Sequence, residues 1–218
     1  MDFELSPVEV RIVGALMEKE KTTPANYPLS LNALTNACNQ KSNRNPVMDI
    51  DETIIAGALD GLGFHRKLTK RLLSDDNRVP KYRHDLTAVF NLTPQEYAAI
   101  CVLLLRGPQT LGEIRGRSER LFNFESLEEV EQTLNRLAER EDPLVKQLPR
   151  QPGRKEARYA HLLSGDIDIE EIDIAEPAVI EIRAENERVD KLEQEVQSLR
   201  EELVALKEQF AAFKHQFE

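Results

Sequence analysis

The sequence has few of the residues that form covalent or metal-bound sites. It contains two cysteines and four histidines in 218 residues. Cys38 and Cys101 lie in apolar segments with helical spacing, which predicts buried, reduced thiols and argues against a disulfide scaffold. The histidines share no metal-ligand spacing, and His84 and His161 occupy repeated positions that fit a structural role. We therefore expect no metal site and no cofactor.

Long apolar segments are also missing. The longest apolar run, Ile100–Leu105, is far too short to cross a bilayer. The first residues are acidic and lack the apolar core of a signal peptide. We therefore expect a cytoplasmic protein that does not enter a membrane.

The formal net charge of −10 is unevenly distributed. Residues 1–90 contain 12 acidic residues and 12 Lys or Arg, and residues 91–165 contain 11 of each. Residues 166–218 contain 16 acidic residues and 6 Lys or Arg, so they account for the whole net charge. The chain is a neutral body followed by an acidic tail.

An internal repeat organises the neutral body. Ser6 and Pro7 form a helix start, with a capping residue and a proline at the first helical position, and Thr93 and Pro94 repeat it 87 positions later. Three further correspondences follow in the same order: Ser30-Leu31 with Thr110-Leu111, the capped helix Asp51–Leu62 with Ser126–Leu137, and the strand Lys81–His84 with Arg158–His161. This order indicates a duplication with changed loop lengths.

Each copy consists of three predicted helices followed by a strand–turn–strand segment. The predicted strands are 67–73 and 79–84 in the first copy, and 144–148 and 156–162 in the second. Three helices followed by a hairpin is the winged-helix arrangement, a relative of helix-turn-helix. We predict an α+β fold, mostly α, with winged-helix domains at 1–90 and 91–165 and a C-terminal coiled-coil helix.

Several short motifs carry a family resemblance over residues 4–163. They are Glu18–Glu20, Thr22–Pro24, Tyr27–Leu31, Ala37–Arg44, Pro46-Val47, Leu104–Thr110 and Glu156–Leu162. With these motifs the sequence resembles the YceH family of bacterial proteins. The resemblance implies a tandem winged-helix fold and a bacterial, cytosolic origin. It implies no activity and supplies no catalytic or binding residues, because the family is uncharacterised.

The tail divides into an acidic linker, 166–177, and a heptad segment, 178–218. Nearly five heptads have apolar residues at spacings of three and four, which predicts a coiled-coil dimerisation helix. The predicted dimerisation residues are Val189, Leu192, Val196, Leu199, Leu203, Leu206, Phe210 and Phe213. A parallel homodimer would place Arg188, Glu195 and Glu202 opposite residues of opposite charge. The alternative is a single amphipathic helix that folds back on the body.

Cations gather in positions from which they could contact DNA phosphates. These positions are the polar connection 40–45, the two hairpins, and the second helix of the second copy. The candidate nucleic-acid-binding residues are Lys41, Ser42, Asn43, Arg44, Lys70, Arg71, Arg78, Lys81, Arg115, Arg117, Arg154 and Lys155. A homodimer of such modules would match two half-sites on duplex DNA.

The third helices argue against base recognition. Their non-core positions carry carboxylates, among them Asp51, Glu52, Asp60, Glu128, Glu131 and Glu139. Carboxylates repel phosphate and suit few base edges. Two functions therefore remain: nucleic-acid binding with a regulatory role through the hairpins and the 40–45 connection, or a scaffold that binds another protein without DNA binding.

No group of residues predicts catalysis. The acidic pair Glu128 and Glu129 occupies solvent-facing helix positions, which indicates solvated charge. Gly61 and Gly63 fit a helix end that enters a hairpin better than a phosphate-binding loop. The sequence therefore predicts a protein without enzymatic activity.

Overall fold

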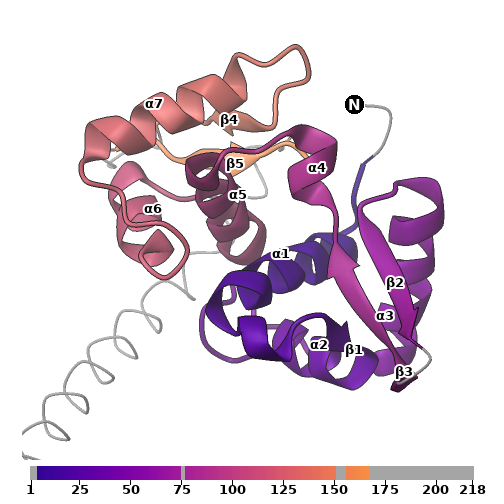
Figure 1. Ribbon diagram of the computed structural model, residues 1–218. Helices are drawn as coiled ribbons and strands as arrows, with labels where there is room; N and C mark the ends of the chain where they lie inside the picture. The colour runs from indigo at the N-terminus through magenta and orange to yellow at the C-terminus, as the bar shows by residue number, and fades with distance from the viewer. Residues whose placement is uncertain (1–3, 75–76, 151–155, 167–218) are drawn as a thin grey trace, which may run out of the picture. The chain divides into compact units, whose positions relative to one another are not determined.

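The computed structural model describes residues 4–74, 77–150 and 156–166, which lie in a compact unit spanning Met1–Ile167 (Figure 1). The helices are α1 Pro7–Thr22, α2 Leu31–Cys38, α3 Glu52–Asp60, α4 Leu86–Phe90, α5 Pro94–Arg106, α6 Leu111–Ser118 and α7 Leu127–Ala138. The strands are β1 Leu29–Ser30, β2 Thr69–Ser74, β3 Asn77–His84, β4 Val145–Gln147 and β5 Tyr159–His161. The predicted α+β class is confirmed.

Both long first helices begin as the sequence predicts. The Ser6 hydroxyl accepts a hydrogen bond from the Glu9 amide at 3.4 Å, and the Glu9 carboxylate accepts one from the Ser6 amide at 2.8 Å. Thr93 and Glu96 form the same reciprocal pair at the start of α5. Each pair satisfies two backbone amides that have no partner within the helix.

The first sheet has the strand order β1-β3-β2, with both pairings antiparallel. Thr69 lies opposite His84, and both side chains are buried. Lys70 lies opposite Arg83. Because neighbouring residues of a strand point to opposite faces, Lys70 and Arg83 lie on the outer face of the hairpin.

The second copy repeats this plan with shorter strands. β4 and β5 pair antiparallel, and an isolated bridge joins Gln109 to Tyr159. The bridge corresponds to the pairing of Leu29 with Tyr82 in the first sheet. Each copy therefore runs helix, bridging strand, helix, helix, hairpin. The sequence gives no sign of the bridging positions, because segments this short have no hydrophobic period.

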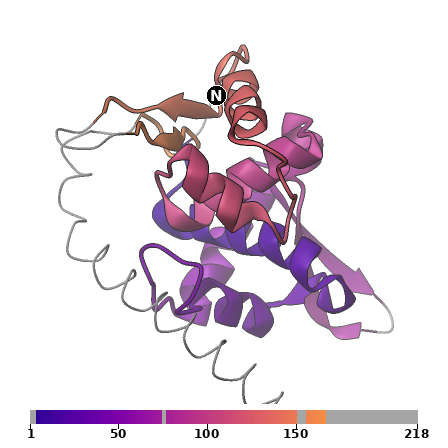
Figure 2. The same cartoon turned by 90° about the vertical axis from the view of Figure 1, so that its left-hand side faces the viewer.

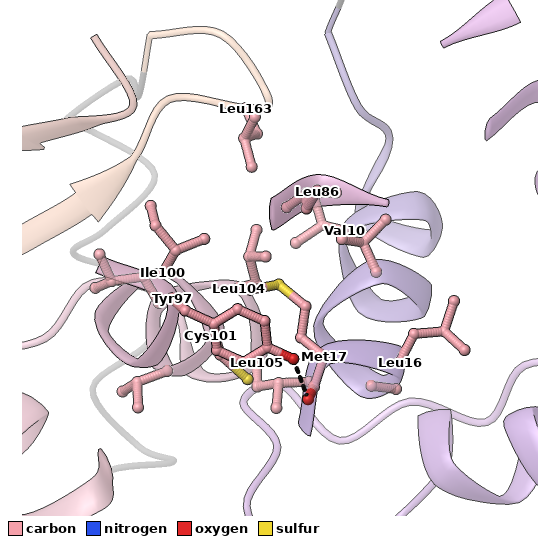
Figure 3. Close-up of a cluster of buried hydrophobic side chains, with 14 of the residues drawn as sticks. Val10, Leu16, Met17, Leu86, Tyr97, Ile100, Cys101, Leu104, Leu105 and Leu163 are labelled. Carbon is pink, nitrogen blue, oxygen red and sulfur yellow. Dashed lines mark hydrogen bonds between the residues drawn. The ribbon is translucent and has the colours of Figure 1, made fainter. Parts of the chain in front are cut away.

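The first helices of the two copies, α1 and α5, pack against each other (Figure 3). At Gly14 the helices come so close that an added Cβ would lie 2.9 Å from Leu105 Cδ2 and 3.1 Å from Leu104 Cβ. The Cys101 thiol lies 3.7 Å from the Gly14 carbonyl oxygen. Gly14 on α1 and Cys101 on α5 are equivalent positions of the repeat. The two copies therefore meet through corresponding positions of their first helices.

A largely buried polar cluster fixes the end of β3 to both helices. The Tyr97 hydroxyl on α5 donates to the Met17 carbonyl oxygen on α1 at 2.6 Å, drawn in Figure 3. His84 Nε2 lies 3.1 Å from the same hydroxyl and 3.2 Å from the Glu20 carboxylate. Burial lowers the pKa of His84 despite this carboxylate. The cluster gives His84 the structural position expected from the repeat.

Candidate nucleic-acid interface

The loop between α2 and α3 contains the polar connection 40–45. It can be followed in Figure 2 as the purple loop beside α2. The Asn39 side chain donates to the Ile50 carbonyl oxygen and accepts from the Ile50 amide, both at 2.9 Å. Arg11 on α1 donates to the carbonyl oxygens of Cys38 at 3.1 Å and Pro46 at 2.6 Å. Side chains therefore hold both ends of this loop in place.

Arg44 lies inside the loop, and its side chain has no exposed surface. Its Nε and Nη2 atoms donate to the Ala37 carbonyl oxygen at 3.1 and 2.8 Å. Its Nη2 atom also lies 2.7 Å from the Glu18 carboxylate on α1. Arg44 thus holds the loop together from the inside. Because it is buried, we do not include it among the residues that could contact DNA.

Lys41, Ser42 and Asn43 are exposed at the tip of the loop. Asn43 adopts a left-handed backbone conformation, with φ of 59°, which asparagine tolerates better than most residues. The structure adds one cation that the sequence did not predict at this loop. Arg106, at the end of α5, donates a hydrogen bond to the Asn43 side chain. The Asn45 amide also donates to the Leu105 carbonyl oxygen at 2.9 Å. The loop of the first copy therefore rests on α5 of the second.

Burial and the nearby charge of Arg117 lower the pKa of Arg106 to about 10. The guanidinium therefore stays charged at neutral pH. No spacing in the sequence could have found this pairing, since Asn43 and Arg106 are 63 positions apart. The two residues come together because α1 packs on α5, which brings the loop after α2 next to the end of α5. The sequence does not show this packing.

The outer face of the β2–β3 hairpin holds three of the described cations. Arg83 and Lys81 are two residues apart on β3, and Lys70 lies opposite Arg83. The side chains of Lys70 and Arg83 are 50% and 42% exposed. Asp85 lies 2.5 Å from Lys70 and 3.6 Å from Arg83, so it neutralises part of this charge. The face keeps a positive excess.

The other predicted contacts on the hairpins are less well placed or not described. Arg71 is exposed and lies opposite Tyr82, on the other face of the hairpin. Arg78 belongs to β3, but its side chain lies outside the described residues. Arg154 and Lys155 also lie outside them, as do the predicted dimerisation residues Val189, Leu192, Val196, Leu199, Leu203, Leu206, Phe210 and Phe213.

The cations of α6 are occupied by the fold. Arg115 donates to the carbonyl oxygens of Phe124 at 3.3 Å and Glu125 at 2.9 Å. Arg117 donates to the Gln109 side chain and lies 3.8 Å from Glu113. Burial lowers the pKa of Arg117, while Glu113 favours its charged form. Both cations hold the turns around α6 and offer few free donors to a ligand.

The exposed faces of the third helices are acidic, as the sequence predicts. Asp51, Glu52 and Asp60 are exposed on α3 or at its start. On and after α7 the exposed residues include Glu128, Glu131, Gln132, Asn135, Arg136 and Glu139. In a winged-helix protein that reads bases, this helix faces the major groove. Here it would bring carboxylates towards phosphates.

Both cysteines are free and buried. Burial raises the pKa of the Cys38 thiol to about 12 and raises that of Cys101 further. Neither thiol is therefore ionised at neutral pH, and nucleophilic cysteine chemistry requires the thiolate.

Within residues 4–74, 77–150 and 156–166, no three His, Cys, Asp or Glu side chains gather as a metal site would require. None of the helices described for these residues is both long and apolar enough to cross a membrane.

Comparison with known proteins places the chain among bacterial relatives. The family model described as "Protein of unknown function, DUF480" matches residues 5–154. A UPF0502 protein of Pelobacter propionicus is 56% identical over 199 residues, which cover 90% of each chain. A UPF0502 protein of Geobacter sulfurreducens is 52% identical over the same share of both chains. These descriptions state no enzymatic activity.

Proposed function

The chain belongs to the DUF480 family, and we propose that it is a non-enzymatic protein that binds duplex DNA through the phosphate backbone and has a regulatory role. The membership confirms the uncharacterised bacterial family that the sequence motifs predicted. In this mode of binding the protein contacts phosphates and does not read bases.

We propose that residues 1–90 and 91–165 are two winged-helix modules. The order of elements supports this, since α1, β1, α2, α3, β2 and β3 follow the winged-helix plan. In the second copy, α5, the bridge at Gln109, α6, α7, β4 and β5 follow the same plan. A fold does not determine a function, so the proposed DNA binding depends on the residues at the surface.

The observation that carries the DNA proposal is the outer face of the β2–β3 hairpin. Lys70, Lys81 and Arg83 share this face by strand register, and no carboxylate other than Asp85 is paired with them in the described contacts. Wing cations of this kind can lie on phosphates or enter a minor groove. Lys41 and Ser42, exposed on the loop after α2, supply a second phosphate contact.

The acidic third helices limit the mode of binding. With carboxylates on the exposed faces of α3 and α7, neither helix suits the major groove. Binding would therefore depend on salt and hardly on sequence, because phosphates carry no sequence information.

Removing two hairpin cations tests the proposal. In the variant Lys70→Gln/Lys81→Gln of the full chain, the slope of log K against log salt should fall by about 2, one for each lost phosphate contact. The control Lys21→Gln/Arg136→Gln changes the net charge equally at exposed positions outside the hairpin. Fluorescence anisotropy with a labelled duplex measures both slopes. Equal slopes in the two variants would contradict the role of the hairpin.

We also propose that residues 178–218 form a parallel dimeric coiled coil after the acidic linker 166–177. The heptad pattern supports this, and a dimer would present two copies of each basic hairpin to one duplex. Light scattering of the full chain at micromolar concentration should give a dimer, and Leu199→Asp/Leu203→Asp should give a monomer. A monomeric wild-type chain would refute the dimer.

The second candidate function is a protein-interaction scaffold without DNA binding. It is favoured by the acidic faces of α3 and α7, which suit a basic partner better than phosphate. Absence of duplex binding at low salt, in a protein that is folded and dimeric, would support the scaffold in place of the DNA proposal.

A further inference from the structure

The exposed face of α3 and of the π-helical turn that follows it, Gly61–His65, combines features that DNA binding leaves unexplained. Thr53, Gly57, Asp60 and Phe64 recur at spacings of four, three and four, and the first, third and last of these are exposed side chains. Residues at these spacings share one side of a helix. They form a continuous line along this face.

Gly57 lies in the middle of this line. A glycine inside a helix lowers the stability of the helix relative to alanine. Here an added Cβ would meet nothing within 4 Å, so no neighbour in the described part of the fold requires a glycine at this position. A glycine at such a position allows another molecule to approach the helix backbone closely.

Two large apolar side chains flank this glycine. Phe64 is 82% exposed and Ile54 is 54% exposed. Ile54 lies one turn before Gly57, and Phe64 lies about two turns after it. Exposed apolar groups that gather on one face mark an interaction site more often than scattered ones. Because position 57 is a glycine, no side chain of α3 stands at this position between them.

The charged residues between Asp51 and Gly63 are all acidic. Asp51, Glu52 and Asp60 are exposed, and the segment Asp51–Gly63 contains no Lys or Arg. Phosphate would be repelled here. A cationic partner would be attracted, and it would gain further from burying an apolar side chain.

We propose that this face, defined by Ile54, Gly57, Asp60 and Phe64, is a docking site for an amphipathic basic helix of a partner protein. The partner presents a large apolar side chain that lies over Gly57, between Ile54 and Phe64. Its Lys or Arg residues, one turn away, face the carboxylates of Asp51, Glu52 and Asp60. The partner helix would lie with its apolar side on this face, and this contact does not depend on whether the hairpins bind DNA.

The test uses the full-length isotope-labelled protein and a synthetic helical peptide of about 18 residues built from Leu, Ala and Lys, with Leu along one side. Amide signals of residues 52–65 should shift on titration with this peptide. A peptide with Glu in place of Lys should cause no shift there. Gly57→Gln places a side chain at the point of close approach and should weaken binding at least about tenfold, while the thermal unfolding midpoint stays equal or rises because Gln favours a helix. Phe64→Ser should weaken binding similarly.

Gly116→Gln on α6 is the matched control, since an added side chain there also meets nothing within 4 Å. This variant should bind the peptide as the wild type does. The proposal is overturned if the shifts fall only outside residues 52–65, if both peptides bind alike, or if Gly57→Gln binds with unchanged affinity. Shifts of residues 52–65 that change on dilution of the protein alone would assign the face to a second copy and would also overturn the proposed partner.

Discussion

Replacing Arg44 by Ala should lower the free energy of unfolding by about 3–5 kcal/mol, the usual effect of removing one partner of a buried ion pair. The guanidinium of Arg44 is buried and ties the Ala37 carbonyl oxygen to the Glu18 carboxylate. Without it, Glu18 stays largely buried with Lys19 as its remaining partner, and the loop after α2 loses its internal tie. Urea denaturation followed by circular dichroism measures the loss, and a loss below about 1 kcal/mol would contradict it.

The pH dependence of this loss gives an independent check. Burial raises the pKa of Glu18, but the hydrogen bonds and the charge of Arg44 together outweigh it, so the pKa lies below its ordinary value of 4.5. A lowered folded-state pKa contributes stability above the unfolded-state value and loses it as the pH falls through the folded-state value. The difference in stability between wild type and Arg44→Ala should therefore be largest near neutral pH and should narrow below 4.5.

Replacing Gly14 by Leu should be the other strongly destabilising change, by about 1–3 kcal/mol or more. A Cβ at this position would lie 2.9 Å from Leu105 Cδ2 and 3.0 Å from Leu105 Cγ, so α1 and α5 would have to separate. Because the two copies meet here, the change should weaken the contact between them. The same denaturation experiment measures the loss.

Gly116→Leu is the control for this prediction. Both glycines lie inside helices, so the gain in helix propensity is the same in the two variants and cancels when they are compared. An added Cβ at Gly116 meets nothing within 4 Å, so Gly116→Leu should leave the stability equal or higher. If Gly14→Leu were tolerated as well as Gly116→Leu, the close approach of α1 and α5 would be refuted.

Local signals predicted much of the fold. Ser6, Thr93 and Ser126 each cap the helix that the sequence assigned to them. Capping depends on residues within three positions of one another, so a single sequence contains the information. The internal repeat supported each predicted element a second time, because the two copies have their elements in the same order.

Contacts between distant segments could not be predicted in this way. A cation in a polar run between two helices normally indicates an exposed residue, yet Arg44 is buried because Glu18 and the Ala37 carbonyl oxygen surround it. Nothing near Arg44 in the sequence shows that α1 supplies a carboxylate 26 positions away. For the same reason the pairing of Asn43 with Arg106 appears only when α1 packs on α5.

The packing of α1 on α5 gives the duplication a physical meaning. In a symmetric dimer, the same surface patch of each subunit meets its partner. Here Gly14 and Cys101, equivalent positions of the repeat, meet in one chain. The two copies are therefore joined as two subunits would be, and the surface left over by this contact carries the cations of the hairpin and the acidic face of α3.

We propose that the outer face of the β2–β3 hairpin and the loop after α2 bind DNA phosphates without reading bases. The affinity of the full chain for two duplexes of equal length and unrelated sequence tests this most directly. Across a salt series, both duplexes should bind with affinities within about threefold of each other and with the same steep slope of log K against log salt, because phosphate contacts release counterions whatever the sequence. No binding at low salt, or a preference of more than about a thousandfold for one duplex, the lower end of specific recognition, would contradict it.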